Sequence, residues 1–361
     1  MKIAIVISAN AFKSPYLSFY IRFLEEQRID YDLICWNRKL IDEPGTISYN
    51  VEQSEQKGYF KRFYAYLGYK KFVTDCLTKN KYDGIIISTI AIAVLLFPFL
   101  KSKYGKKYVF DIRDYSIIVK FSWFVFTRLI DNSIATVVSS SGFIQWLPKS
   151  SKYYIAHNFP FELTSKNGSF IYKNQQLNKN TKSFEITTIG SLRDYEANKM
   201  IIDPFKNSKQ FKLKFIGSGP ASEPLKEYVL DSKVSNVSFK GFYKKEDEAT
   251  LLCKSNFINN FTNYDLNSRT LMTNRFYLSV VLAIPMIVRE GTHQADLCKK
   301  HNLGCVINPA FAIPEQILEY IESFDYKQYS QGRYLFLELV KRDIELLNNV
   351  LMKFVGKDVD G

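Results

Sequence analysis

The stretch KIAIVISANAFKSPYLSFYIRFLEEQRIDYDLICW (residues 2–36) predicts a strand, a helix and a second strand. KIAIVIS (2–8) and YDLICW (31–36) are short apolar runs rich in β-branched residues, as buried strands are. Between them, PYLSFYIRFLEEQ (15–27) repeats its apolar residues with the period of a helix. A helix that joins two buried strands is the usual connection in a parallel sheet. The stretch therefore predicts a parallel α/β fold.

The same alternation continues along the chain and predicts two such sheets in tandem. The 361 residues are too many for one comfortable core and suit two domains. In the first half we expect further strands at residues 84–88, 107–112 and 135–140. In the second half we expect strands at residues 185–190, 212–217, 237–241, 257–261, 285–288 and 304–307.

A polar, turn-rich segment, residues 158–183, marks the expected boundary between the domains. Residues 333–355 have helical period with no strand after them, so we expect a terminal helix that packs back across both domains. The expected division is therefore into domains 1–160 and 161–335, followed by a crossover helix and tail, 336–361.

The composition argues against several classes of protein. Hydrophobic residues make up 46% of the chain, which argues against general disorder. The five cysteines are scattered without a CxxC pair and only three histidines occur, so we expect reduced cytoplasmic thiols and no metal centre. The first residues read as a strand and not as a signal peptide. The longest apolar run, residues 85–100, is shorter than the roughly 20 residues of a spanning helix. Pro98 also interrupts this apolar run, and we expect the run to form a strand, a loop at Ser88 and Thr89, and a core helix.

The positive charge is unevenly distributed. The net charge is +13, and residues 1–160 hold 22 Lys and Arg against 13 Asp and Glu. An excess of this kind favours an anionic partner. It belongs mainly to the first half of the chain.

The loops that follow the strands are the candidate sites, because ligands of open α/β sheets bind beyond the carboxyl ends of the strands. The first such loop, residues 8–15, has no GxGxxG, which argues against a nicotinamide enzyme. FIGSGP (215–220) follows a strand, and its glycines suit either close approach of a ligand or a tight turn. In IGSLRDYEANK (189–199), Arg193 and Lys199 either neutralise a phosphate or are solvated surface charges.

Residues 267–288, NSRTLMTNRFYLSVVLAIPMIV, have the richest site-like content. Their polar side chains precede or begin an apolar helix, whose unpaired N–H groups and dipole favour an anion. The alternative is a helix cap with two surface arginines. The polar residues concerned are Ser268, Arg269, Thr273, Asn274 and Arg275.

Taken in order, these motifs resemble the C-terminal half of family 4 glycosyltransferases of the bacterial surface-polysaccharide type. TTIGSLRDYEANK is similar to that family's glycine-arginine-leucine loop, KFIGSGP to its GxGP segment, and NVSFKGFYKKED to its GF loop. TNRFYLSVVLAIPMIV resembles its donor-helix motif, and GTHQADLCKKHNLGCVIN its closing stretch. The resemblance runs from residue 187 to residue 308. FDIRDYS (110–116) and AHNF (156–159) match the first half more loosely.

The resemblance implies the GT-B fold, with an acceptor-binding N-terminal and a donor-binding C-terminal Rossmann-like domain. It implies transfer from a nucleotide sugar with retention of configuration, and no metal or other cofactor. We expect Arg193 and Arg275 to stabilise the departing diphosphate. Asp114 would accept a hydrogen bond from the acceptor hydroxyl, or instead form a cap or an ion pair with Arg113. The implied donor-binding residues are Gly190, Ser191, Arg193, Lys199, Gly217, Gly219, Phe242, Thr273, Asn274 and Arg275.

Two features depart from the family's pattern. The family carries two glutamates separated by seven residues, the second of which binds the donor ribose. Alignment on Pro285 puts Thr270 and Leu278 in their places. Arg193 also follows GSL instead of directly following the glycine. The departures imply altered ribose binding, an unusual donor or reduced activity.

The stretch KGYFKRFYAYLGYKKF (57–72) combines aromatic rings with positive charge. On a helix, Phe60, Phe63 and Tyr64 share a side with Leu67, while lysines cluster at both ends. Such a helix suits the headgroup region of an anionic membrane, and the alternative is a helix whose rings fill the core. Nucleic acid is not expected, because no recognised binding module is present. The residues assigned to acceptor and membrane binding are Tyr59, Lys61, Arg62, Phe63, Tyr66 and Lys70.

These observations together predict a glycosyltransferase that extends a lipid-linked oligosaccharide in capsule, O-antigen or exopolysaccharide synthesis. We expect a cytoplasmic protein, peripheral at the inner face of the cell membrane. Its partners would be a nucleotide sugar, the lipid-linked acceptor and the anionic membrane surface. Two alternatives stay open: a GT-B nucleotide-sugar epimerase, and a non-catalytic nucleotide- or sugar-binding scaffold, which the missing glutamates favour.

Overall fold

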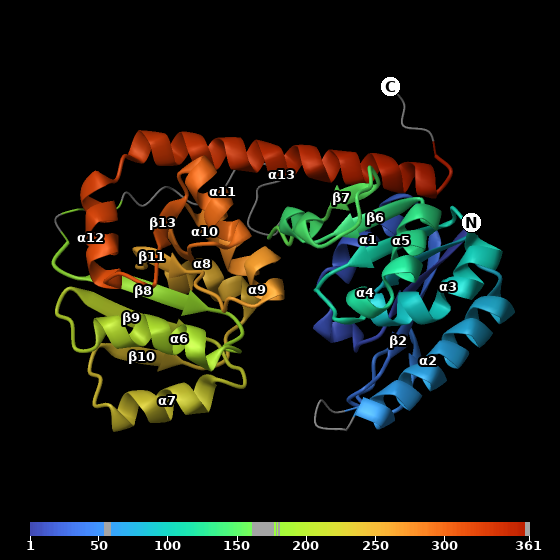
Figure 1. Cartoon of the computed structure of the whole chain (residues 1–361), viewed down its shortest axis with the longest axis horizontal. Coiled ribbons are helices and arrows are strands. Elements are labelled where there is room, and N and C mark those ends of the chain that lie inside the picture. The colour runs from blue at the N-terminus through green and yellow to red at the C-terminus, as the bar shows by residue number, and fades with distance from the viewer. Residues whose placement is uncertain (54–58, 161–176, 178, 180, 358–361) are drawn as a thin grey trace. The chain divides into compact units, whose positions relative to one another are not determined.

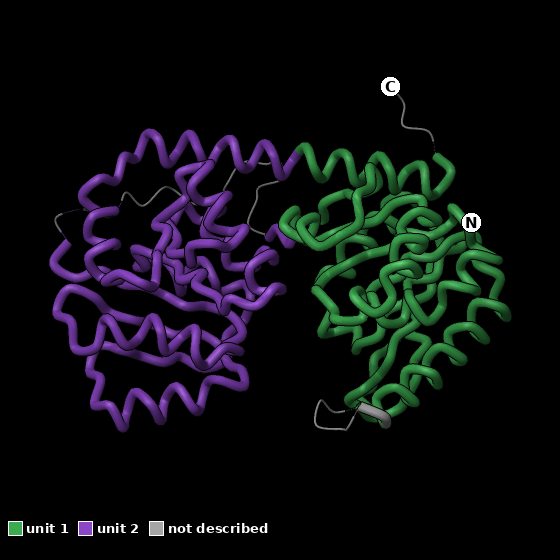
Figure 2. The backbone as a smooth tube through the Cα atoms, in the orientation of Figure 1, with its two compact units in different colours: residues 1–157, 342–361 green, residues 158–341 purple. Residues whose placement is uncertain are grey.

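The computed structural model describes residues 1–53, 59–160, 177, 179 and 181–357. The chain divides into two compact units (Figure 2). Unit 1 comprises residues 1–157 and 342–361, and unit 2 comprises residues 158–341. Sequence analysis placed the end of the second domain at residue 335, whereas the structure carries unit 2 on to residue 341.

The described residues of unit 1 form a seven-stranded parallel sheet in the order β3-β2-β1-β4-β5-β6-β7 (Figure 1). All five strands expected in the first half are confirmed. The sequence missed β3 and β7, which lie at the sheet edges, are half-buried and lack an apolar run. The strands are β1 Lys2–Ile7, β2 Asp30–Trp36, β3 Thr46–Tyr49, β4 Gly84–Ser88, β5 Tyr108–Ile112, β6 Ala135–Val138 and β7 Tyr153–Ile155. The helices are α1 Leu17–Glu26, α2 Tyr59–Asn80, α3 Ile90–Tyr104, α4 Ile118–Phe121 and α5 Trp123–Asn132.

The described residues of unit 2 form a six-stranded parallel sheet in the order β10-β9-β8-β11-β12-β13 (Figure 1). All six strands expected in the second half are confirmed. They are β8 Phe184–Ile189, β9 Phe211–Ile216, β10 Val237–Lys240, β11 Phe257–Asn259, β12 Met286–Arg289 and β13 Gly304–Ile307. The helices are α6 Tyr195–Ile202, α7 Ser222–Asp231, α8 Glu248–Leu252, α9 Leu266–Thr270, α10 Asn274–Leu282, α11 His293–His301, α12 Ile313–Ser323 and α13 Tyr326–Phe354.

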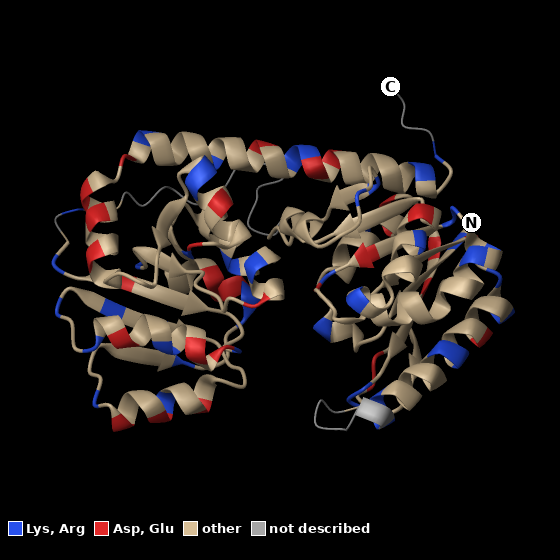
Figure 3. Cartoon of the chain, viewed as in Figure 1, with Lys and Arg blue, Asp and Glu red and all other residues tan. Residues whose placement is uncertain are grey.

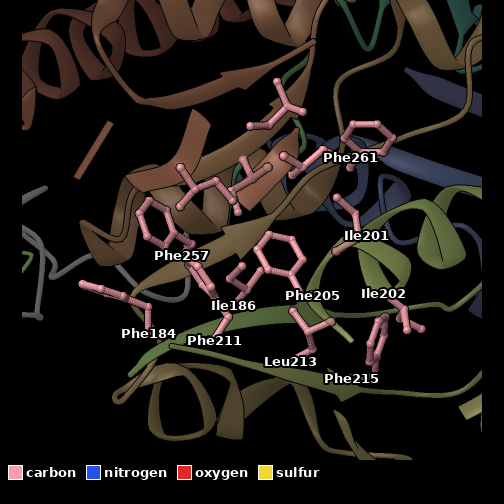
Figure 4. Packing of buried hydrophobic residues seen from close by; sticks show 14 of the residues in the cluster. Phe184, Ile186, Ile201, Ile202, Phe205, Phe211, Leu213, Phe215, Phe257 and Phe261 are labelled. Carbon is pink, nitrogen blue, oxygen red and sulfur yellow. The ribbon is translucent and has the colours of Figure 1, made fainter. Parts of the chain in front are cut away.

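The central strands are apolar on both faces, as strands covered by helices on both sides must be. Every residue of β4 and β5 is buried. In unit 2 the core beside the sheet combines aliphatic side chains with several phenylalanines (Figure 4). Phe205 and Phe211 meet edge to face there, with ring centroids 4.8 Å apart. The alternation that predicted the fold is thus the pattern that fills the two cores.

Helix α13 contributes to both cores. Residues 326–341 belong to unit 2, where the ring of Phe336 packs against that of Phe276 with centroids 5.4 Å apart. Residues 342–354 belong to unit 1. In that part, the buried members of the unit 1 core are Leu347, Val350, Leu351 and Phe354.

The apolar run at residues 85–100 forms β4, a turn and the buried helix α3, as expected. In the part of the chain that the structure describes, no helix has both the length and the apolar character needed to cross a membrane.

Both sheets reverse their strand order at a central pair, β1 and β4 in unit 1 and β8 and β11 in unit 2. Loops that leave the carboxyl ends of such a pair diverge, which opens a crevice where ligands of α/β sheets bind. The fold therefore directs attention to the loops after β8 and β11, and in unit 1 to those after β1 and β4.

Candidate functional site

The loops after β8 and β9 are joined backbone to backbone. The N–H of Gly190 donates to Ile216 O at 2.9 Å, and that of Leu192 donates to Ser218 O at 3.2 Å. A Cβ on Gly217 would lie 2.0 Å from Gly190 O, and one on Gly219 would lie 2.4 Å from Leu192 O. These glycines are needed for the packing of two loops, which favours the tight-turn interpretation over close approach of a ligand.

Helix α10 begins beside these loops with a well-formed cap. Thr273 accepts a hydrogen bond from the N–H of Phe276 at 3.2 Å, and Asn274 is the exposed first helical residue. Arg275 lies in the first turn, where the free N–H groups and the dipole add to its positive charge. The predicted helix start is confirmed, and it gathers three of the candidate residues at one point.

The guanidinium of Arg275 is half-buried and forms no ion pair among the described residues. Burial lowers its pKa to about 10, and the more distant Asp194 and Tyr243 offset only part of this. These two residues follow β8 and β10, so Arg275 lies among the loops at the carboxyl end of the sheet. A desolvated cation without a counter-ion is poised to bind an anion.

A buried polar layer surrounds the cap of α10. Thr273 Oγ lies 2.8 Å from both Asn260 Oδ1 and Gln294 Oε1, and a hydroxyl carries only one proton. Asn260 and Gln294 are fully buried, and among the described residues their side-chain nitrogens have no partner. Whichever way each amide is turned, one of its polar atoms stays unpaired. Buried unpaired atoms are costly, so this layer is ready to hydrogen-bond a ligand or water.

Replacing Thr273 by Val should lower the free energy of unfolding by about 2–3 kcal/mol, because it removes the cap and leaves two buried amides without their shared partner. Thr273→Ser keeps the hydroxyl and should cost less than about 1 kcal/mol. Urea titration of the two variants measures the difference. A larger loss in Thr273→Ser than in Thr273→Val would mean that the methyl group, and not the hydroxyl, stabilises this site.

Two further arginines lie beyond β11 and β12: Arg269, which the sequence marked as site-like, and Arg289, which it did not. The guanidinium carbons of Arg269 and Arg289 lie 5.0 Å and 4.9 Å from the ring centroid of Tyr264. Nearby carboxylates are engaged elsewhere: Asp265 caps α9, and Glu290 pairs with Lys299 at 2.9 Å. Figure 3 shows both blue and red segments around α9. This end of unit 2 therefore holds arginines whose charge the neighbouring carboxylates do not neutralise.

The remaining donor-site candidates have different surroundings. Arg193 and Ser191 are exposed, and Arg193 Nε donates to Ser191 Oγ at 3.2 Å. Phe242 follows β10 and is 82% exposed. Lys199 Nζ lies 5.0 Å from the ring centroid of Tyr228 on α7, so its charge takes part in the packing of α6 against α7.

The positions that align with the missing glutamates are both buried. Thr270 is fully buried and donates to Leu266 O at 2.8 Å. Leu278 packs in an apolar cluster with Ile189 and Ile258. Neither position presents a polar group to a ligand, so a donor ribose would need other partners.

In unit 1 the carboxyl end of β5 holds a buried ion pair. Asp111 Oδ2 accepts a hydrogen bond from Arg113 Nε at 2.8 Å, and in the ion pair it lies 2.7 Å from Arg113 Nη2. Burial raises the pKa of Asp111, and Arg113 offsets part of that rise. Asp114 is the exposed residue that follows this pair. At the neighbouring strand end, Thr89 has a φ of 84°, a strained conformation for a β-branched residue and one found most often at functional sites.

The aromatic stretch forms the first half of α2 and divides between core and solvent. Tyr66 packs edge to face on Trp36 and accepts a hydrogen bond from Arg38 Nη2 at 2.9 Å. Tyr69 is fully buried, and its hydroxyl donates to Ile7 O. The core interpretation therefore holds for this face of the helix, including Tyr66.

The start of α2 is solvent-exposed around most of its circumference. Phe63 and Tyr64 are 54% and 70% exposed, beside exposed Lys61 and Arg62, whereas Lys70 is half-buried. The side chain of Tyr59 lies outside the described residues. The membrane interpretation is thus restricted to the start of the helix.

Sequence reasoning missed Asn260, Gln294 and Arg289. Two adjacent asparagines at the end of the apolar run FINNF were a signal for Asn260. Nothing in the pattern distinguished a buried Gln294 from an exposed one. Within residues 1–53, 59–160 and 181–357, no cluster of three or more His, Cys, Asp or Glu is arranged to hold a metal ion.

No known family and no curated protein matches this sequence. Solved structures match over the whole chain. Sucrose-phosphate synthase from Thermosynechococcus elongatus matches with a TM-score of 0.70 at 11% identity, over 99% of each chain. The lipopolysaccharide outer core galactosyltransferase WaaB matches with 0.64 at 14%, over 98% of this chain and 99% of its own.

The Anabaena protein HepE, in complex with UDP and glucose, matches with a TM-score of 0.64 at 14% identity, over 97% of this chain and 100% of its own. The chain has the GT-B fold. The predicted fold class is therefore confirmed. At such low identity the likeness shows the fold, and the chemistry must be argued from the residues.

Proposed function

We propose that this chain is a glycosyltransferase that binds the diphosphate of a nucleotide sugar at the start of α10. The observation that carries the proposal is the unpaired, desolvated guanidinium of Arg275. It follows two residues after Thr273, whose hydroxyl contacts the buried layer in which Asn260 and Gln294 each keep one unpaired polar atom. A dianionic ligand at a helix N-terminus would satisfy the cation, the helix N–H groups and the dipole together.

The proposed chemistry follows from where charge develops. When the sugar leaves its donor, negative charge accumulates on the diphosphate. Arg275, Arg193 and the first N–H groups of α10 would stabilise that charge more strongly in the transition state than in the bound donor. Asp114 would accept a hydrogen bond from the acceptor hydroxyl. The proposed transfer retains the configuration of the sugar and uses no metal.

The finer assignment is a lipid-linked oligosaccharide acceptor in bacterial surface-polysaccharide synthesis, used by a cytoplasmic protein at the inner membrane face. The sequence resemblance and the exposed Phe63, Tyr64, Lys61 and Arg62 of α2 support it. Among the structural neighbours, WaaB is named a lipopolysaccharide galactosyltransferase, which favours a lipid-linked acceptor. Sucrose-phosphate synthase and trehalose-6-phosphate synthase favour a soluble one.

A non-catalytic nucleotide- or sugar-binding scaffold is the second candidate. The burial of Thr270 and Leu278 at the two glutamate positions favours it, because neither side chain can replace a carboxylate. A GT-B nucleotide-sugar epimerase would bind the same donor and use no lipid-linked acceptor. Sugar transfer to a lipid-linked acceptor separates the three.

A thermal-shift screen against UDP, GDP, ADP, CMP and dTDP is the first test. A ligand that binds only the folded state must raise the unfolding midpoint. We expect one nucleoside diphosphate to raise it and Arg193→Ala to reduce the rise. If none of them raises the midpoint at millimolar concentration, the proposed donor site is wrong.

A further inference from the structure

Helix α4 and the start of α5 expose an unusual run of large apolar side chains. Ile117 is 54% exposed, Phe121 87%, Trp123 48% and Phe124 64%. We call these four residues the α4–α5 patch. They are not an unpacked core, because both helices bury their other faces. The buried residues are Val119 on α4 and Phe126, Leu129 and Ile130 on α5.

The charged side chains within the segment that carries the α4–α5 patch are positive. Residues 115–130 contain Lys120 and Arg128 and no Asp or Glu, and the carboxylates of Asp114 and Asp131 flank the segment. Both cations are exposed, and the guanidinium carbon of Arg128 lies 3.9 Å from the ring centroid of Phe124. An apolar ring with a cation beside it matches the depth profile of a bilayer surface, where rings enter the acyl boundary and cations meet lipid phosphates.

The α4–α5 patch lies at the edge of unit 1 that carries the strand ends. Because the sheet is parallel, every loop that follows a strand leaves from this edge. Asp114 lies in the loop between β5 and α4, which leaves from the same edge. Further exposed apolar residues on loops that leave this edge are Phe12, Leu40, Ile41 and Ile144.

We propose that the α4–α5 patch is the surface by which unit 1 inserts into an anionic lipid bilayer. This deepens the proposed function, since it assigns the lipid contact to a surface beside Asp114 and not to α2 alone. In α2, Tyr66 and Tyr69 are committed to packing, which leaves Phe63 and Tyr64 as a secondary contact. A bilayer fits better than an acidic protein because four large apolar side chains accompany two cations.

The test is sedimentation of the full chain with vesicles of mixed phosphatidylglycerol and phosphatidylcholine, compared with phosphatidylcholine alone. We expect the mixed vesicles to bind at least tenfold more protein at low salt. The double variant Phe121→Glu/Phe124→Glu should lose at least tenfold in partition. The matched control is Leu230→Glu/Phe311→Glu in unit 2, where the replaced side chains are 77% and 67% exposed. It should bind vesicles as the wild type does.

Trp123 gives a second, direct readout. Its fluorescence should shift to the blue on addition of mixed vesicles, and the shift should vanish in Trp123→Phe while sedimentation stays unchanged. Trp36 is fully buried and should not respond. Equal loss of sedimentation in both double variants would overturn the proposal. So would a wild-type dimer in light scattering that Phe121→Glu/Phe124→Glu dissociates, because the patch would then pair two copies.

The outcome is separable from that of the proposed function. Phe121 and Phe124 belong to unit 1, and the donor-site candidates belong to unit 2. The double variant should therefore keep its thermal shift with nucleoside diphosphate. A shift without vesicle binding in the wild type would overturn the bilayer contact and leave the glycosyltransferase proposal standing.

Discussion

Arg275→Gln should abolish the thermal shift with nucleoside diphosphate while leaving the unliganded protein at least as stable as the wild type. Burial lowers the pKa of Arg275 from 12.5 to about 10, so the charged form is disfavoured in the folded state. The resulting loss in the free energy of unfolding is fully present below pH 10, and it diminishes as the pH rises from 10 towards 12.5. The difference between these two pKa values corresponds to roughly 3 kcal/mol of destabilisation. Replacing the guanidinium by a neutral side chain should restore on the order of 1 kcal/mol of the free energy of unfolding. Turnover should fall by about 10²–10³.

The matched control is Lys212→Gln, which removes one positive charge from an exposed position on β9 of the same unit. It should change neither the unfolding midpoint nor the ligand-induced shift. Urea titration without ligand and thermal scans with it measure the two effects of Arg275→Gln separately. A variant that loses stability and keeps its shift would show that Arg275 is structural.

Gly217→Ala should lower the free energy of unfolding by about 3–5 kcal/mol, since strain and overpacking act together. The φ of Gly217 is +128°, a region that residues with a side chain rarely adopt. The added methyl would also lie 2.0 Å from Gly190 O, a backbone atom that cannot move aside without separating the loops after β8 and β9.

Substitutions at two other glycines distinguish the effect of backbone strain from that of the steric clash. Gly190 also has a positive φ, +105°, but faces open space, so Gly190→Ala should cost about 1–2 kcal/mol. Gly241 has open space and no such φ, so Gly241→Ala should be close to neutral. Urea titration of the three variants should rank them Gly217, Gly190, Gly241. Equal losses at Gly217 and Gly190 would mean that the loops yield and the collision is relieved.

The strands were predictable wherever burial on both faces left a continuous apolar run, as in β1 and β4. That signal failed at both edges of the sheet in unit 1. Residues 46–49 and 153–155 are half-buried, and their composition is mixed, so the pattern could not distinguish them from loops. The edge strands of unit 2, β10 and β13, were found, although β10 alternates between half-buried and exposed residues.

The candidate site was predictable only as far as local sequence determines it. The cap at Thr273 follows from a polar residue before an apolar helix, and the structure confirms that start. The side chain of Lys199 lies over the ring of Tyr228, a residue far from it in the sequence. The partners of Asn260 and Gln294 likewise come from separate strands and helices. Packing between residues far apart in the sequence determines these contacts, and the local sequence pattern does not predict it.

The course of α13 sets an order of events during synthesis. The core of unit 1 includes Leu347, Val350, Leu351 and Phe354, which the ribosome adds more than 340 residues after Ile3 and Ile5 of the same core. Domains generally fold as units, and the N-terminal one usually folds first during synthesis. Most of unit 1 is synthesised first, but its core is incomplete until the end of α13 has left the ribosome. Unit 2 ends at residue 341, so its core needs no later residue. Part of the apolar face of the first sheet therefore stays exposed until α13 has been synthesised. Chaperones have access to that face during this period.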